Sequence, residues 1–396
     1  MNNVKEQAVL LESVRTPIGG FGGSLSQIAA SDLAAIVLRE SAKRSKVDMG
    51  VIDQIILGCV GQVAEDGYIA RHAAIKAGAA INSTAYTVNR ICGSGLEAIN
   101  TAARWIELGE AQYILAGGVE NMSLMPYYIR KGRYGYKYGD GALEDGTLDL
   151  LTDPFEGYPM GITAENVVSK YNISREQQDE FAFYSHERAI SAQKNHYFDS
   201  QIIQVDTGGR DNKIFTTDEH VRETNIKKLS QLRPAFKTDG SVTAGNASGI
   251  NDGAAAVVVT SESNAKSIKA ETYFRIISRA VCGVDHTIMG TGPIPSVQQA
   301  LHAAGLSIND MDVIELNEAF AAIALACASE LKIDLKRMNP NGGAIALGHP
   351  IGATGVILTT KLMHEMNRIK GKYGLVTLCI GGGQGIATIF ERVAKD

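Results

Sequence analysis

Short apolar stretches alternate with longer stretches whose apolar residues recur every three or four positions, most clearly at the two ends of the chain. The first kind of stretch predicts buried strands, and the second predicts amphipathic helices. The predicted elements are strands over 8–13, 52–60, 274–280 and 313–316 and helices over 32–45 and 296–304. Strands and helices that follow one another in turn are typical of an α/β fold.

The two ends of the chain also resemble each other. In a hand alignment Asp53 falls on Asp312, and further along Cys92 falls opposite His349. Similarity of this kind within one chain indicates an internal duplication. We therefore predict two similar α/β halves packed about a pseudo-twofold axis.

We place the first half at 1–270 and the second at 271–396. Residues 121–250 lack the strand and helix alternation and form a predicted insertion in the first half. The insertion contains one clear helix over 174–194, which begins with Ser174 and Gln177 at the spacing of a capping box. An insertion of this length in an α/β protein is typical of a subdomain that covers a substrate.

Composition narrows the class of protein. The chain has 42 glycines in 396 residues, and its 38 Lys and Arg against 43 Asp and Glu give a net charge of −5. A mildly acidic chain is not expected to coat nucleic acid. The N-terminus carries no signal or transit peptide pattern, and no apolar run is long enough for a membrane span.

Cysteine usage indicates a reducing compartment, and we expect the cytoplasm. The five cysteines are odd in number, widely spaced and free of any Cys-x-x-Cys pair, which argues against disulfides and zinc. They are Cys59, Cys92, Cys282, Cys327 and Cys379.

The first of three glycine clusters is Cys92-Gly-Ser-Gly. A strand end over 84–89 precedes it, and a helical pattern follows and stops at Gly109. Cys92 is thus predicted at a helix N-terminus, whose partial positive charge favours a thiolate and a lowered thiol pKa. The alternative is a buried structural cysteine, which is our interpretation of Cys59 and Cys327.

The other two clusters surround His349, in Gly-His-Pro-Ile-Gly, and Cys379, which ends a strand and meets four glycines. Only 11 residues remain after Gly385, too few for the βαβ unit that a dinucleotide fingerprint requires. Asn317 ends a further strand, where ligands bind in α/β sheets. The alternative for His349 is a core histidine, that for the Cys379 cluster is a structural turn, and that for Asn317 is a helix N-cap. We expect the remaining histidines at the surface: His72, His186, His196, His220, His286, His302 and His364.

These motifs together resemble the thiolases. Cys92-Gly-Ser-Gly, Asn317-Glu-Ala-Phe, Gly348-His-Pro and Cys379-Ile-Gly-Gly-Gly are similar to the four active-site loops of that family, in the same order, and 245–253 is similar to its coenzyme-A-binding stretch. The resemblance runs from Arg15-Thr-Pro to the last strand. It implies a layered αβαβα fold and reversible Claisen condensation of two acetyl-CoA to acetoacetyl-CoA and CoA, in fatty-acid metabolism, with no cofactor beyond the CoA thioesters.

The resemblance also implies roles for particular residues. Cys92 is the nucleophile that carries the acyl group, His349 is its base, and Cys379 is the acid or base at the α-carbon. Asn317 positions a water that forms one oxyanion hole with His349, and the N–H groups of Cys92 and Gly381 form the other. A carbon nucleophile and two oxyanions require such groups.

The implied binding residues are less specific. They are Ser248 at the pantetheine, Arg222 at the adenine, Ala244 directly before the CoA-binding stretch, and Phe236, Met160, Met289 and Phe320 as pocket walls. The alternative for the apolar ones is ordinary packing. Pro159 stands where many biosynthetic members have histidine, which leaves the acyl chain length open.

A tyrosine-rich stretch over 127–138 also carries Arg130, Lys131, Arg133 and Lys137. The family resemblance implies a loop that joins dimers into a homotetramer, and its charge also suits attraction of anionic CoA. Single-stranded nucleic acid is the weaker alternative.

Three alternatives to the acetyl transfer remain. One is a β-oxidation 3-ketoacyl-CoA thiolase, and another is a non-catalytic acyl-CoA or lipid-binding member of the fold. A ketosynthase is disfavoured because those sites pair the cysteine with two histidines, and here the second position is Asn317.

Overall fold

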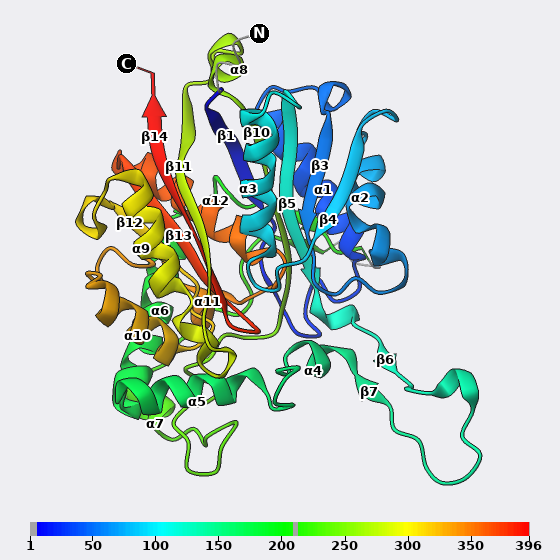
Figure 1. Cartoon of the computed structure of the whole chain (residues 1–396), viewed down its shortest axis with the longest axis vertical. Coiled ribbons are helices and arrows are strands. Elements are labelled where there is room, and N and C mark those ends of the chain that lie inside the picture. Colours follow the sequence, from blue (N-terminus) through cyan, green and yellow to red (C-terminus); the bar gives the residue numbers. More distant parts are fainter. Residues whose placement is uncertain (1–5, 209–212, 396) are drawn as a thin grey trace.

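The computed structural model describes residues 6–208 and 213–395 and is built around one large mixed sheet (Figure 1). Its strands are β1 (Ala8–Arg15), β2 (Gly19–Gly20), β3 (Gln54–Gly58), β4 (Thr84–Val88), β5 (Tyr113–Asn121), β10 (Asn251–Ser261), β11 (Thr272–Gly283), β12 (Val313–Leu316), β13 (Tyr373–Ile380) and β14 (Gln384–Ala394). Their order is β12-β13-β14-β11-β1-β10-β5-β3-β4, with β2 paired to β10.

The sheet consists of two half-sheets of the same topology. In the first, β1, β10 and β5 are antiparallel neighbours, and β3 and β4 then follow in parallel. In the second, β11, β14 and β13 are antiparallel neighbours, and β12 follows in parallel. Within the described sheet, the two half-sheets join where β1 pairs with β11, at Val9↔Arg275 and Leu10↔Phe274.

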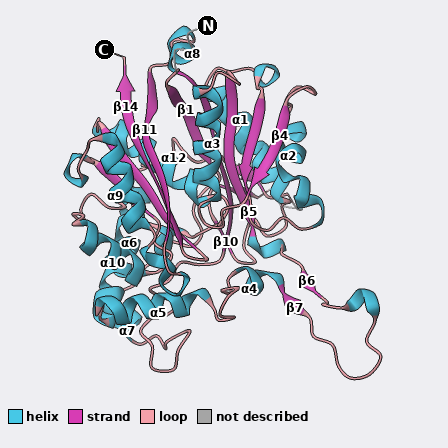
Figure 2. Cartoon of the chain, in the orientation of Figure 1, coloured by secondary structure: helices cyan, strands magenta, loops and turns pink. Residues whose placement is uncertain are grey.

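The helices form three layers around the half-sheets (Figure 2). They are α1 (Ala30–Arg44), α2 (Ile69–Ala77), α3 (Ser94–Glu107), α8 (Glu262–Ser267), α9 (Pro293–Ala304), α10 (Ala321–Leu331), α11 (Ala344–Leu347) and α12 (Thr354–Ile369). Helices α1 and α2 cover the first half-sheet, α9 and α10 cover the second, and α3 and α12 lie between them. The predicted αβαβα fold is confirmed.

Alternation along the strands produces these layers. Leu10 of β1 belongs to the central core with α3 and α12, whereas its neighbour Val9 belongs to the outer core beneath α1. Both faces of a strand in this architecture are covered, so its residues are apolar on both sides. No helix among the described residues is long and apolar enough to cross a membrane.

The duplication extends to individual hydrogen bonds. The N–H of Asp53 donates to the carbonyl of Tyr113 (3.0 Å), and the Tyr113 N–H returns a bond to Asp53 Oδ2 (3.0 Å). In the second half Asp312 and Tyr373 exchange the same two bonds, at 2.8 and 3.1 Å. Asp53 and Asp312, which the hand alignment matched, thus occupy equivalent places.

Glycines allow α3 and α12 to meet at backbone distance. A Cβ added to Gly95 of α3 would lie 2.9 Å from the Gly352 carbonyl oxygen, and one added to Gly355 of α12 would lie 2.2 Å from the Leu96 nitrogen. A Cβ added to Gly118 of β5 would lie 2.3 Å from the same carbonyl oxygen. Any side chain at these places would force the two halves apart.

The insertion holds more structure than the sequence indicated. Besides α6 (Arg175–Lys194), it contains β6 (Tyr127–Tyr128), β7 (Glu144–Asp145), α4 (Gly146–Leu150), α5 (Met160–Tyr171), β8 (Val205–Asp206), β9 (Ile214–Phe215) and α7 (Ile226–Ser230). The capping box at Ser174 is present as predicted. The expectation of one helix was wrong because α5 begins behind Pro159 in a glycine-rich stretch that carries no side-chain cap.

Several element bounds and one burial prediction need correction. Strand β11 is longer than predicted at both ends, and α9 begins at Pro293, three residues before the predicted start. His186 was expected at the surface but is fully buried, because α7, α10 and α11 pack around α6. Short 3₁₀ turns complete the described chain at Met49–Val51, Ala64–Tyr68, Met122–Leu124, Gly132–Tyr134, His286–Thr291 and Ile308–Asp310.

Candidate active site

Cys92 lies on a sharp turn between β4 and α3. Ile91 before it has a φ of +44°, a left-handed conformation that is rare for a β-branched residue and marks a strained turn. Ser94 holds the turn, because its Oγ accepts from the Arg90 N–H (2.8 Å) and donates to the Ile91 carbonyl (2.6 Å). The turn leaves Cys92 partly exposed, with its thiol free.

The expected lowering of the Cys92 pKa is wrong. Burial raises the pKa of the thiol to about 11, and the carboxylate of Glu120 adds to the rise. The N–H groups of Gly381 and of Cys92 itself point at the sulfur and act in the opposite direction. Desolvation outweighs them, since it disfavours the charged form of the thiol, so Cys92 rests as a neutral thiol.

His349 is held by hydrogen bonds at its backbone and at its ring. Its backbone N–H donates to Asn251 Oδ1 at 2.9 Å, and its ring Nδ1 lies 2.6 Å from Thr354 Oγ1. That hydroxyl donates to the Pro350 carbonyl (2.9 Å), so Nδ1 carries the proton and donates to Thr354. Burial lowers the pKa of His349 to about 4, which leaves Nε2 as a free base at neutral pH.

Asn317 follows the last residue of β12 and faces that free nitrogen. Its Nδ2 lies 3.3 Å from His349 Nε2, and its backbone N–H donates to the Thr377 carbonyl of β13 (3.0 Å). Its side chain and that of His349 are both buried. The structure therefore brings these two predicted residues together.

Cys379 and Gly381 come from the turn between β13 and β14. Cys379 is buried, and burial and the neighbouring Cys92 raise the pKa of its thiol well above the ordinary value. Gly382 and Gly383 have φ of +84° and +87°, which turn the chain so that the Gly381 N–H reaches Cys92. These contacts place the second cysteine and the glycine loop beside the first cysteine, as the motifs predicted.

Glu120 is a residue that the sequence analysis missed. This buried carboxylate, in β5, accepts from the N–H groups of Val60 (3.1 Å), Gly61 (2.8 Å) and Gly352 (2.8 Å). It joins the loop after β3 to the loop that carries His349. Its place near the carboxyl end of a strand was a signal that could have found it.

The four predicted apolar wall residues lie in one cluster. Met289 is buried there, with Met160, Phe236 and Phe320 packed against it. The rings of Phe236 and Phe320 meet edge to face at 6.0 Å between centroids. A Cβ added to Gly381 would lie 3.1 Å from Met160 Cε, so this cluster adjoins the glycine loop beside Cys92.

The stretch 245–253, which resembles a CoA-binding segment, leads towards His349, and Arg222 lies beside its start. Arg222 Nη2 donates to the Ala244 carbonyl (3.3 Å), and the Ser248 N–H donates to the Ala319 carbonyl (2.9 Å). At the far end is Asn251, whose side chain binds the His349 backbone. We call Arg222 together with residues 244–251 the strip, which includes Ala244 and Ser248. Among the described residues, no hydrogen bond joins Arg222, Ala244 or Ser248 directly to Cys92 or His349.

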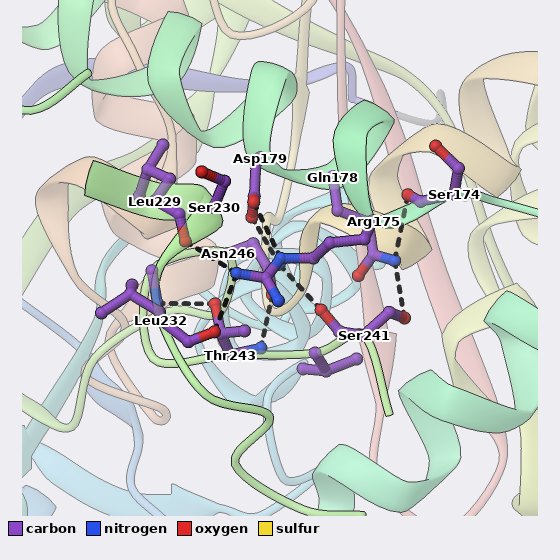
Figure 3. Close-up of polar contacts among 12 residues, drawn as sticks. Ser174, Arg175, Gln178, Asp179, Leu229, Ser230, Leu232, Ser241, Thr243 and Asn246 are labelled. Atoms are coloured by element: carbon purple, nitrogen blue, oxygen red, sulfur yellow. Dashed lines mark hydrogen bonds and ion pairs between the residues drawn. The ribbon is translucent and has the colours of Figure 1, made fainter. Parts of the chain in front are cut away.

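A polar network fixes the start of this strip to α6 (Figure 3). Asn246 Nδ2 donates to Asp179 Oδ1 (3.0 Å), and its Oδ1 accepts from the Thr243 N–H (2.8 Å). Arg175 binds the other Asp179 oxygen (2.7 Å) and the Leu229 carbonyl (2.7 Å). The capped N-terminus of α6 therefore supports both the strip and the loop around α7.

Pro159 ends the loop before α5 and is exposed, with no side-chain donor. Its carbonyl accepts from the Ile162 N–H (2.9 Å), and the neighbouring Met160 N–H donates to the Leu151 carbonyl (2.9 Å). Pro159 is thus the N-cap residue of α5, and its ring gives the helix no side-chain cap.

The layered fold, with Cys92 and His349 on the turns before α3 and α12 of its two halves, agrees with the class of acyltransferases that the motifs indicated. The chain belongs to the thiolase family: the model of the thiolase N-terminal domain matches residues 8–263, and that of the C-terminal domain matches 270–392.

Individual relatives agree over nearly the full length. The chain is 49% identical to the beta-ketothiolase BktB of Cupriavidus necator, over 98% of this chain and 99% of the relative. It is 47% identical to the acetyl-CoA acetyltransferase of Escherichia coli, over 98% and 100%. The crystal structure of the Bacillus anthracis acetyl-CoA acetyltransferase matches with a TM-score of 0.97 at 43% identity, over 99% and 100%. Human mitochondrial 3-ketoacyl-CoA thiolase in complex with CoA matches with 0.95 at 40%, over 99% of each chain.

Proposed function

We propose that this chain is an acetyl-CoA C-acetyltransferase, which condenses two acetyl-CoA to acetoacetyl-CoA and CoA and runs the reverse thiolysis. One observation carries the proposal: Glu120 lies beside a neutral Cys92 thiol that has two N–H donors at its sulfur, and it also binds the loop that holds an unprotonated His349 Nε2. The acetyl-CoA acetyltransferases among its relatives support acetyl-CoA as the substrate.

In the first half-reaction Cys92 Sγ attacks the thioester carbonyl of acetyl-CoA while His349 takes the thiol proton. The N–H groups of Cys92 and Gly381 receive the oxyanion that forms, because they already point to the sulfur. The C–S bond to CoA then breaks, and His349 returns the proton to the leaving thiolate. The product is an acetyl thioester on Cys92.

In the second half-reaction the thiolate form of Cys379 removes an α-proton from another acetyl-CoA, and the carbon attacks the acetyl-Cys92 carbonyl. We propose that His349 and Asn317, through a water, stabilise the enolate oxygen meanwhile. The C–S bond to Cys92 then breaks and releases acetoacetyl-CoA, and the proton taken up by Cys379 passes to the Cys92 thiolate, so that both cysteines return to their starting states. In thiolysis the neutral Cys379 thiol protonates the released enolate, a task that its raised pKa suits. The proposal assigns every step to side chains and CoA thioesters, without a cofactor.

The direct test is steady-state thiolysis of acetoacetyl-CoA by the wild type and by Cys92→Ala. We expect the variant to lose activity by several orders of magnitude, because no other group forms the thioester. Mass spectrometry after mixing with acetyl-CoA should show acetylation of Cys92 in the wild type. Wild-type rates in the variant would refute the proposed role of Cys92. A clear kcat/KM preference for longer 3-ketoacyl-CoA substrates would refute the assignment of acetoacetyl-CoA as the preferred substrate.

We further propose a cytoplasmic homotetramer, a dimer of dimers. The arm formed by β6, β7 and residues 129–143 projects from the body (Figure 1) and carries exposed Tyr134 and Tyr138. Exposed aromatic rings on a projecting arm favour contact with another copy. The arm's Arg130 pairs with Glu144 and Asp149, so part of its positive charge is already neutralised. All five cysteines are free, which supports a reducing compartment.

A further inference from the structure

The side chain of Asn317 forms few hydrogen bonds of its own. Within the described residues its Oδ1, though buried, has no hydrogen-bond partner, and its Nδ2 has only the 3.3 Å contact to His349. One long hydrogen bond cannot fix an amide plane. The orientation of Asn317 therefore depends on the backbone on either side of it, at Leu316 and Glu318.

The side chain of Asn339 forms hydrogen bonds with the backbone of Leu316, the residue before Asn317. Its Oδ1 accepts from the Leu316 N–H at 2.9 Å, and its Nδ2 donates to the Leu316 carbonyl at 2.8 Å. The carboxamide thus pairs with Leu316 as a peptide group of a neighbouring strand would. Its two bonds fix which atom is oxygen and which is nitrogen.

The same carboxamide also holds the residue after Asn317. Asn339 Nδ2 donates to Glu318 Oε1 at 2.7 Å, and Ser185 Oγ of α6 donates to Glu318 Oε2 at 2.6 Å. Gly343 permits this arrangement, since a Cβ there would lie 2.1 Å from the carboxyl carbon of Glu318. Both neighbours of Asn317 are therefore fixed by one buried side chain.

Comparison of the two halves shows why an asparagine is needed. In the first half β3 pairs along its whole length with β4, from Gln54↔Thr84 to Gly58↔Val88. In the second half the matching partner of β12 is a single bridge, Ile314↔Met338. Asn339 follows with a φ of +46°, which turns the backbone away, and its side chain supplies the missing pairing.

We propose that Asn339 is a positioning residue for the thiolase reaction: it holds the Leu316 backbone and the Glu318 carboxylate so that Asn317 faces His349 Nε2. This inference rests on the proposed function. It assigns Asn339 no contact with substrate, so its loss should slow the chemical step and leave substrate binding almost unchanged.

The test uses Asn339→Gly, because glycine adopts the left-handed φ and only the three side-chain bonds are lost. Asn339→Asp is a second variant, which keeps the acceptor for the Leu316 N–H but loses both donated bonds. The control is Asn341→Ala, which removes a buried bond in the same loop, from Asn341 Nδ2 to Glu365 Oε2 (2.9 Å). For each we would measure kcat and KM in acetoacetyl-CoA thiolysis and the rate of Cys92 alkylation by iodoacetamide.

We expect both Asn339 variants to lose kcat by about 10- to 100-fold, the range for a misplaced catalytic group or oxyanion donor. KM and the alkylation rate should stay within about twofold of the wild type, and Asn341→Ala should keep its kcat. In a double-mutant cycle, Asn339→Gly should cause little further loss in an Asn317→Ala background, because it acts through Asn317.

Additive losses in that cycle, or a kcat for Asn339→Gly equal to that of Asn341→Ala, would overturn the inference. A parallel fall of kcat and alkylation would do so too, because it would indicate collapse of the whole site. If neither Asn339 variant folds while Asn341→Ala does, Asn339 serves the fold rather than Asn317, and the inference is wrong. An inactive wild type would instead refute the proposed function.

Discussion

The nucleophile and its base are both kept neutral by the same physical cause. Burial raises the pKa of Cys92 to about 11 and lowers that of His349 to about 4. A thiolate–imidazolium pair would be desolvated in this site, so the proton stays on sulfur until a thioester arrives. The resting site therefore contains no thiolate–imidazolium ion pair, and His349 acts as a general base during the attack.

The raised thiol pKa predicts how Cys92 reacts with iodoacetamide. Since only the thiolate reacts and its fraction grows about tenfold per pH unit below the pKa, the alkylation rate should rise steadily from pH 7 to 9. Second-order rate constants by mass spectrometry, with Cys92→Ser to subtract other cysteines, measure this. A rate that levels off below pH 8 would contradict the neutral resting thiol.

Thr354 is predicted to set the proton position on His349. Thr354→Val removes the acceptor for Nδ1–H, so the tautomer with a free Nε2 loses its support and kcat should fall about tenfold or more. Thr359→Val is the matched control, because Thr359 lies in the same helix and its hydroxyl bonds only the Gly355 carbonyl (2.8 Å). Equal kcat in the two variants would rule out this role of Thr354.

At the scale of elements, the contact of α3 with α12 ties both halves to the site, since each helix follows one of the two turns. The close approach at Gly355 leaves no room for a methyl group, as the Leu96 backbone nitrogen would lie 2.2 Å from it. Backbone cannot move aside as the end of a side chain can. The glycine excess of the sequence thus has a structural reason beside the catalytic loops.

Gly355→Ala should therefore destabilise the protein by about 3 kcal/mol or more, at the upper end of overpacking effects. Gly67→Ala is the control, because a Cβ there meets no atom within 4 Å and Gly67 needs no left-handed φ. Chemical denaturation of both variants measures the difference. Similar midpoints would show that the two helices can separate without loss.

The sequence predicted those elements whose pattern is local. Strand β12 and the capped start of α6 were found because alternation and capping spacing are written in consecutive residues. The sequence also singled out candidate site residues that end a strand or stand beside glycine, namely Cys92, His349, Asn317 and Cys379. Glu120 and Asn339 were not found, since their partners lie in distant segments that only the folded chain brings near.

The direction of the Cys92 pKa could not be predicted from sequence either. A helix N-terminus is visible in the local pattern, whereas desolvation depends on everything that surrounds the sulfur. The same limit applies to His186, which lies among polar neighbours in the sequence and is fully buried in the fold.

At the scale of the whole molecule, the projecting arm predicts the assembly. Tyr134 and Tyr138 are 83% and 102% exposed at its end. The double variant Tyr134→Ser and Tyr138→Ser should weaken the tetramer and favour dimers, because it removes apolar contact area from the arm. Light scattering coupled to size-exclusion chromatography gives the mass, with Tyr184→Ser, half-exposed on α6, as control. A wild type that is already dimeric would contradict the prediction.

The side chain of Asn339 has a consequence for how copies of the chain can join. Strand β4 is the last strand at one end of the sheet, and its backbone is available for pairing with another copy. At the other end, Met338 and the carboxamide of Asn339 already occupy the bonding groups of β12. Edge-to-edge pairing with another copy is therefore not expected at the β12 end of the sheet, where Met338 and the carboxamide of Asn339 already lie.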